Sequence, residues 1–161
     1  MSGEKPSWLV ALEGRLRELG AELEVQGSIL RVRPAPGKVR EVAAAAVEAG
    51  FDHLASVEGI DWPSKGVIEV VYHAESYEPE KRRFLFEVRV QLPREKPVTP
   101  SLFDVWPNAL FMERETWEML GVIFEGHPEL RRLLLPPGWE GPPPLRKDFK
   151  VVEEGIYVEY E

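Results

Sequence analysis

Glutamate, arginine and one histidine are concentrated between residues 113 and 135, in the stretch ERETWEMLGVIFEGHPELRRLLL. Carboxylates and an imidazole can exchange protons, so Glu113 and His127 could form a general acid–base pair. The arginines could instead bind carboxylates or carbonyl groups of a neighbouring chain through their planar guanidinium groups. This density of charge therefore indicates either an active site or a docking surface.

Other kinds of chemistry leave no motif in the sequence. His53, His73 and His127 form no HExxH or His-x-His spacing, and cysteine is absent, so ligation of zinc or an iron–sulfur cluster by this chain is not expected. The sequence contains no Gly-x-Ser-x-Gly nucleophile motif and no glycine-rich phosphate loop. We therefore predict no catalytic, cofactor-binding or metal-binding residue, and no cofactor held by this chain.

Helical projection places Glu113 within an apolar stripe. The members of the stripe recur at alternating spacings of four and three residues: Trp106, Leu110, Glu113, Trp117 and Leu120. An unpaired buried carboxylate is costly, so Glu113 needs a cation or several backbone N–H donors. We favour an internal ion pair over the two alternatives, a contact with a partner and proton transfer at a raised pKa.

The charged residues around Glu113 have two further interpretations. Arg114 and Glu118 are four residues apart and could pair across one helical turn. Residues 127–135 predict a second short helix, with the proline of the His-Pro pair in its first turn. Arg131 and Arg132 would project from this helix, either as a solvated basic face or as a contact with a partner chain.

A proline-rich arm is expected to follow. Residues 136–144 hold five prolines and two glycines, so this stretch should run extended over a surface. LRKDF, at residues 145–149, repeats the combination of cations, one acid and flanking apolar residues. A stiff arm loses little entropy on docking, which favours binding over catalysis. The tail, at residues 150–161, could add a late strand.

The elements before residue 100 indicate an α+β fold. Apolar stripes predict helices at 9–19 and 39–47, each followed by a glycine. Strands are expected within 21–34, turning at Gln26-Gly27, and at 51–61, 67–73 and 84–90. Alternation of apolar and charged residues in the last strand predicts a sheet with one face on the core.

These elements give a small mixed or antiparallel sheet with helices packed on one face, plus an extended proline-rich C-terminal arm. We place the α+β domain at residues 1–100, and the helix, charged segment and arm at 101–161, as one structural unit. In the second part, a helix should begin near Pro107 and end at Gly121, and a short strand should follow at 122–124.

Composition limits the class of partner. The net charge of -8 disfavours nucleic acid, which needs a basic surface. Neither a secretory signal nor a run of about 18–20 apolar residues occurs, so no membrane span is expected. Attachment to a membrane would therefore depend on partner proteins.

The charged segment, followed by LRKDF, resembles the signature of the 30-kDa subunit family of respiratory complex I, which is the C-type subunit of NADH–quinone oxidoreductase. Glu118 stands where that family usually has Asp. The resemblance covers roughly residues 49–150, and we predict that its signature residues form a subunit interface. These residues are Glu113, Arg114, Glu115, Trp117, Glu118, Gly121, Phe124, Gly126, His127, Pro128, Leu130, Arg131, Arg132, Leu145, Arg146, Lys147, Asp148 and Phe149.

The resemblance implies a cofactor-free accessory or scaffold subunit of the peripheral arm of a complex I-type NADH–quinone oxidoreductase. Such a subunit would support electron transfer from NADH to quinone, coupled to proton translocation. Flavin and iron–sulfur clusters would lie in partner subunits, and the contacts would be with subunits of the D, B and I types. The location would be the cytoplasmic, inner face of the cell membrane. The alternative is the equivalent subunit of a membrane-bound energy-converting hydrogenase or formate hydrogenlyase complex.

Overall fold

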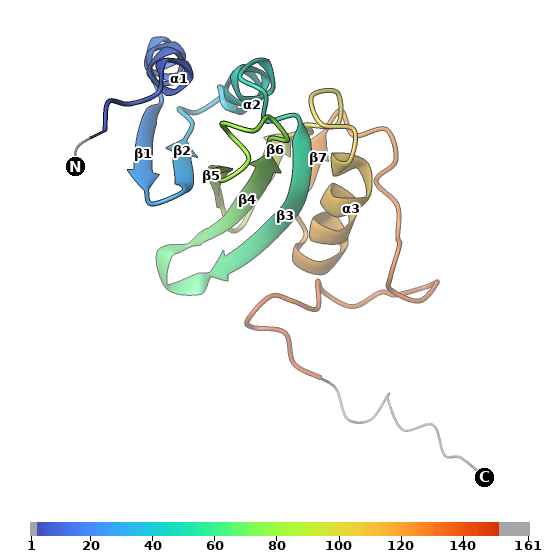
Figure 1. The fold of residues 1–161 in the computed structure, drawn as a ribbon. Coiled ribbons are helices and arrows are strands. Elements are labelled where there is room, and N and C mark those ends of the chain that lie inside the picture. The colour runs from blue at the N-terminus through green and yellow to red at the C-terminus, as the bar shows by residue number, and fades with distance from the viewer. Residues whose placement is uncertain (1–2, 152–161) are drawn as a thin grey trace.

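The computed structural model describes residues 3–151, which form an α+β fold (Figure 1). The predicted tail strand lies largely outside the described residues. In chain order the elements are α1 (Ser7–Glu18), β1 (Glu22–Gln26), β2 (Ile29–Arg33), α2 (Val39–Glu48), β3 (His53–Trp62), the 3-10 turn η1 (Pro63–Lys65), β4 (Val67–Glu75), β5 (Leu85–Pro93), β6 (Val98–Pro100), α3 (Ala109–Leu120) and β7 (Ile123–Glu125).

The main sheet is mixed, as predicted. Its strand order is β1-β2-β5-β4-β3, and β2 pairs with β5 in parallel while the other neighbours are antiparallel. The chain leaves β2, crosses through α2 and reaches the far edge at β3. It then returns through β4 to β5, which fills the gap beside β2. A second, two-stranded sheet pairs β6 with β7 in parallel.

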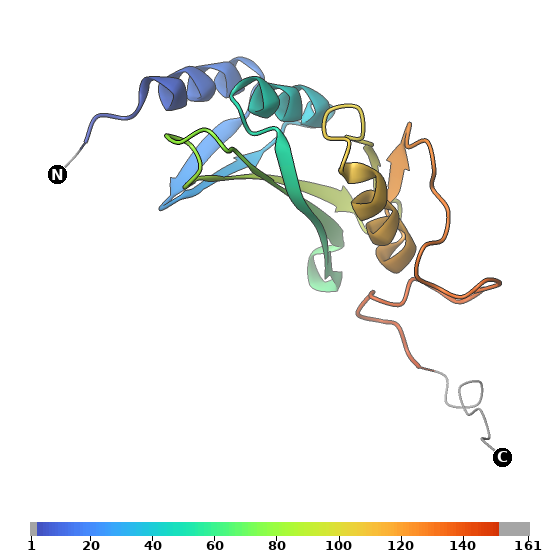
Figure 2. The ribbon, with the colours of Figure 1, turned by 45° about the vertical axis from the view of Figure 1, so that its right-hand side comes forward.

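The helices pack on one face of the main sheet, also as predicted. Figures 1 and 2 show α1 and α2 side by side above the sheet, with α3 lying along β3. The apolar stripes of α1 and α2 join the inward side chains of the strands in a single core. Gly20 and Gly50 follow the two helices with positive φ angles of 74° and 98°, which explains why each helix ends there.

The other face of the sheet carries a network of charged side chains centred on Glu87. Arg31 Nε and Arg89 Nε donate to its carboxylate at 2.5 and 2.6 Å, and His73 Nε2 lies 2.9 Å away. Arg89 also binds Glu69 at 2.7 Å. Burial opposes ionisation of Glu87, but the hydrogen bonds from Arg89, Arg31 and His73 outweigh it and lower its pKa to about 2.

Gly59 in β3 sets how closely α3 approaches the sheet. A Cβ atom built there would lie 2.1 Å from Leu120 Cδ1 and 3.2 Å from Thr116 Cγ2. We therefore expect Gly59→Ala to lower the free energy of unfolding by about 1–3 kcal/mol, through overpacking. Gly14→Ala is the control, because Gly14 is helical with nothing within 4 Å, and should stabilise by about 0.5–1 kcal/mol. Urea unfolding measures both; equal stability of Gly59→Ala and wild type would contradict the packing argument.

The Glu87 network should make stability depend on pH in a defined window. The folded-state pKa lies below the ordinary value of 4.5, so its stabilisation is fully present above pH 4.5. It is lost as pH falls toward about 2. Wild type should therefore lose up to roughly 3 kcal/mol more than Glu87→Gln between pH 7 and pH 2. Urea unfolding of both proteins across this pH range measures the difference. The control is Glu95→Gln, at an exposed turn residue, which should show the same pH dependence as wild type.

Candidate functional site

Helix α3 carries polar side chains on its buried side. It begins at Ala109, two residues after Pro107, and ends at Leu120, where Gly121 follows with a left-handed φ of 79°, in agreement with the predicted start near Pro107 and stop at Gly121. Trp106 packs in the core just before the helix instead of within it. Three charged residues of α3, Glu113, Arg114 and Glu118, are at most 4% exposed. Buried charged groups require hydrogen-bond partners, and these three side chains have different sets of partners.

Glu113 is fully buried and accepts three hydrogen bonds. The donors are Tyr72 Oη at 3.1 Å, Ser101 Oγ at 2.6 Å and the Leu102 backbone N–H at 2.8 Å. The favoured ion pair is therefore wrong, because hydroxyl groups and one backbone amide replace the expected cation. Burial raises the pKa of Glu113, against these hydrogen bonds. The Glu113 carboxylate thereby links Ser101 and Leu102, which precede α3, to Tyr72 of β4.

Arg114 binds the backbone of the segment that follows β7. From here on, "the arm" means residues 127–151, which include the proline-rich stretch at residues 136–144. Arg114 Nε donates to the carbonyl of Arg131 and Nη2 to the carbonyl of Arg132, both at 3.1 Å. The nearest carboxylate to the guanidinium is Glu129, at 3.9 Å. A buried guanidinium thus supplies donors to two carbonyl groups that lie outside any helix or strand.

Glu118 binds the next three residues of the arm. Its carboxylate accepts the backbone N–H groups of Leu133, Leu134 and Leu135 at 3.1, 2.9 and 2.6 Å. Burial opposes ionisation, but these three bonds prevail and hold the pKa of Glu118 below its ordinary value. Arg114 and Glu118 together hold five consecutive residues by backbone atoms alone. We call this pair of side chains the clamp.

The clamp explains why two of the predictions are wrong. Arg114 and Glu118 make no ion pair with each other, since each is bound to the arm. Residues 127–135 form no helix. In a helix the Leu135 N–H would donate to the Arg131 carbonyl, but the clamp takes both groups. The segment is therefore held in turns and bends, outside any helix, by bonds that no local sequence pattern reveals.

His127 is bound inside the arm rather than free for proton transfer. Its Nε2 donates to the Leu110 carbonyl at 2.8 Å, and its Nδ1 accepts the Glu129 N–H at 2.9 Å. Both ring nitrogens are therefore occupied by hydrogen bonds. Glu113 is equally occupied by its three donors. The geometry of both residues fits a structural role better than an acid–base pair.

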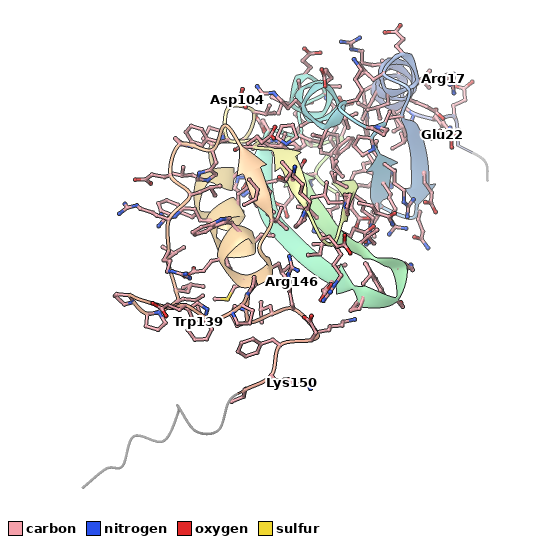
Figure 3. The ribbon with its side chains drawn as sticks, turned by 180° about the vertical axis from the view of Figure 1, so that it is seen from behind. Arg17, Glu22, Asp104, Trp139, Arg146 and Lys150 are labelled. Carbon is pink, nitrogen blue, oxygen red and sulfur yellow. The ribbon has the colours of Figure 1, made fainter. Side chains whose placement is uncertain are left out.

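The LRKDF segment returns to the end of α3. Leu145 N–H donates to the Met119 carbonyl at 2.9 Å, and Arg146 Nε to the Leu120 carbonyl at 2.8 Å. Figure 3 shows Arg146 at this end of the helix, between Trp139 and Lys150 along the arm. Carbonyl groups at a helix C-terminus lack partners within the helix, so these two donors cap α3.

Asp61 of β3 anchors the same segment, although no sequence motif marks it. It accepts a two-pronged bond from Arg94, at 2.7 and 3.0 Å, and the Lys147 backbone N–H at 2.9 Å. Arg94 also binds Asp148 at 3.0 Å. The hydrogen bond from Arg94, with that from Lys147, outweighs burial and lowers the pKa of Asp61. The period-2 register of β3 could have identified Asp61 as an inward-facing carboxylate.

Because the clamp binds the backbone of the arm, apolar side chains of the arm face outward. Leu133 is 43% exposed, Leu134 is 57% exposed, and Phe111 on α3 is 57% exposed beneath the guanidinium of Arg114. We call these three residues the apolar patch. Arg131, two residues before Leu133, is exposed and pairs with Glu129 at 3.1 Å. Exposed large apolar side chains are a feature of protein interfaces.

The predicted interface residues divide into two groups. The first is buried or partly buried and builds the clamp and its surroundings: Glu113, Arg114, Trp117, Glu118, Gly121, Phe124, His127, Leu130, Arg146 and Phe149. The second is exposed: Glu115, Gly126, Pro128, Arg131, Arg132, Leu145, Lys147 and Asp148. The second group is the more available to touch another chain directly, and the interface role of both groups stays a prediction.

Loss of the clamp should release the arm. In Glu118→Ala the three amides lose a charged acceptor, and bonds of this kind contribute about 1.5–3 kcal/mol. Trypsin should then cut after Arg131 and Arg132 roughly tenfold faster, because cleavage follows local opening. Glu115→Ala, at an exposed position of the same helix, is the matched control and should keep the wild-type rate. Equal cleavage rates for the two variants would rule out a clamp at Glu118.

Comparison with known proteins gives one matching family. The family described as "Respiratory-chain NADH dehydrogenase, 30 Kd subunit" matches residues 32–155. The chain is 43% identical over 100 residues to the C-type subunit of the F(420)H(2) dehydrogenase of Methanosarcina mazei, covering 62% of this chain and 61% of that protein. It is 37% identical over 143 residues to the C-type subunit of the NADH-quinone oxidoreductase of Moorella thermoacetica, covering 87% and 94%.

A solved structure extends the comparison to three dimensions. A chain of the membrane-bound sulfane sulfur reductase, an archaeal respiratory membrane complex, aligns with a TM-score of 0.78 and 26% identity, covering 92% of this chain and 89% of that one. Several relatives are longer, and the chain spans only 45% to 61% of their length. No helix within residues 3–151 combines the length and hydropathy of a membrane span. The family match covers most of the sequence, and the chain therefore belongs to the 30-kDa subunit family of the respiratory-chain NADH dehydrogenase.

Proposed function

We propose that this chain is a cofactor-free accessory subunit in the peripheral arm of a complex I-type NADH–quinone oxidoreductase. Its role is to hold other subunits in place while electrons pass from NADH to quinone and protons are translocated. The observation that carries the proposal is the clamp. Arg114 and Glu118 satisfy the backbone of residues 131–135, so Leu133 and Leu134 stand outward on a rigid segment. A rigid segment loses little entropy when a partner binds it.

The names of the relatives support a scaffold role. Related chains are named as subunits of an F(420)H(2) dehydrogenase, of NADH-quinone oxidoreductases and of a sulfane sulfur reductase complex. Those complexes differ in the compounds that they oxidise or reduce. A subunit type common to them is expected to supply what they share, which is assembly, and not the chemistry in which they differ. The fully occupied hydrogen-bonding groups of Glu113 and His127 agree with this role.

The proposed partners are subunits of the D, B and I types. The apolar patch and the neighbouring Arg131 would face the hydrogenase-like D-type subunit, close to the quinone site. Flavin and iron–sulfur clusters would be held by other subunits. The chain would be attached peripherally, through these partners, on the cytoplasmic face of the membrane.

A second candidate is the equivalent subunit of a related respiratory complex with a different electron donor or acceptor, such as an energy-converting hydrogenase or a formate hydrogenlyase. The observation in its favour is the TM-score of 0.78 with a chain of the sulfane sulfur reductase complex. Purification of the native complex separates the two candidates. Co-purification of flavin- and NADH-binding subunits supports the first, and their absence beside hydrogenase-like subunits supports the second.

Docking through the apolar patch can be tested by co-purification of the assembled complex. Leu133→Ser combined with Leu134→Ser should reduce the recovered partner subunits at least tenfold, because buried anchor residues carry about 2 kcal/mol or more of binding free energy. The isolated variant should keep its wild-type thermal unfolding temperature, since both side chains are exposed.

The control removes equally exposed apolar side chains elsewhere. Val10 is 53% exposed on α1 and Val25 is 43% exposed on β1. Val10→Ser combined with Val25→Ser should leave recovery of the partners unchanged. Wild-type recovery in the Leu133 and Leu134 variant would show that the patch does not dock.

A further inference from the structure

Strand β3 is an edge strand of the main sheet: among the described residues it pairs only with β4. Contacts with other parts of the chain are made near both of its ends. At its beginning the Asn108 side chain reaches the Leu54 carbonyl at 3.5 Å, and near its end Asp61 binds Arg94 and the Lys147 N–H. Within the described part of the chain, the backbone of residues 55–60 makes hydrogen bonds with β4 alone. An uncovered edge of this kind can pair with a further strand.

A groove runs beside this open edge, between β3 and α3. Its volume is about 210 Å³. The residues that line it come from β3, from α3 and from the arm: Val57, Glu58, Gly59, Glu115, Thr116, Met119, Leu120 and Leu145. Figure 2 shows the two elements side by side. The absence of a side chain at Gly59 brings Leu120 against the strand, and the bond from Leu145 to the Met119 carbonyl fixes the outer wall.

Acidic side chains flank the groove. Glu58 borders the groove, and its side chain is 58% exposed and reaches to 4.0 Å from the imidazole of His73. Glu115 is exposed on α3 beside the groove. A strand added along β3 would send alternate side chains to the two faces of the sheet. One set would enter the apolar groove, and the other set would lie beside Glu58.

We propose that residues 55–60 of β3 receive one extended strand from a partner subunit, in which apolar residues alternate with lysine or arginine. Backbone hydrogen bonds would supply affinity, and the groove and the two glutamates would supply specificity. The inference rests on the proposed function in one respect, that this chain assembles with other subunits. It adds the site and the chemistry of the segment that binds there.

Charge argues against two other segments that could pair with β3, namely the C-terminal residues of this chain and β3 of a second copy. Residues 152–161 of this chain contain four glutamates, which the acidic border of the groove would repel. A second copy paired edge to edge would bring its own Glu58 beside this one, in a chain with a net charge of -8. A basic, apolar segment of another protein meets neither obstacle.

Hydrogen exchange measured by mass spectrometry tests the proposal directly. The two samples are the full-length chain alone and the native complex that contains it. In the complex, outward-facing amides of residues 55–60 should exchange at least tenfold more slowly than in the isolated chain, because a new strand would bind them. A matched pair of charge reversals follows: Glu58→Lys should weaken retention of the partner subunits, and Glu48→Lys, at an exposed position of α2, should not.

Each other outcome has a distinct meaning. Unchanged exchange at residues 55–60, with slower exchange at residues 131–135, overturns the strand proposal while the proposed function stands. A chain that co-purifies with no respiratory subunit overturns both. Protection of residues 55–60 in the isolated chain that depends on concentration identifies a second copy as the occupant. Protection that disappears when residues 152–161 are deleted identifies the tail, and either result overturns the proposal of a partner strand.

Discussion

The carboxylate of Glu118 is the interaction on which the position of residues 131–135 depends most. It accepts three consecutive backbone N–H groups, while Arg114, one turn earlier, donates to the two preceding carbonyls. Two side chains therefore satisfy five backbone groups of a segment that belongs to no helix or strand. These bonds leave Leu133 and Leu134 exposed, while separate bonds to Leu110 and to the end of α3 hold His127 before them and LRKDF after them.

The parts of the structure set by local pattern could be predicted, and those set by distant partners could not. The stripe of Leu9, Leu12 and Leu16 predicted α1, and the alternation of Phe86 and Val88 with Glu87 predicted the core face of β5. Residues 127–135 have a helical pattern, yet α3 takes the hydrogen bonds that a helix would need. The pairing of Asp61 with Arg94 is likewise invisible in a single sequence, since 33 residues separate them.

Buried glutamates have different hydrogen-bond partners on the two faces of the sheet. On the uncovered face, Glu87 and Glu69 are neutralised by arginines, which lowers the pKa of Glu87 to about 2. On the helical face, Glu113 has hydroxyl and amide donors and no cation, and burial raises its pKa. The two glutamates thus have opposite pKa shifts because the hydrogen bonds from guanidinium groups and His73 outweigh burial at Glu87, whereas burial outweighs the three hydrogen bonds at Glu113.

The position of β5 has a consequence for how the chain folds during synthesis. β5 lies between β2 and β4, so residues before it form two hairpins, β1-β2 and β3-β4, that do not touch as neighbouring strands. The sheet becomes continuous only when residues 85–93 have left the ribosome. Until then, both inner strand edges are open to wrong pairing, a hazard of nonlocal topology. The nascent chain therefore depends on its last long strand to join two halves made earlier.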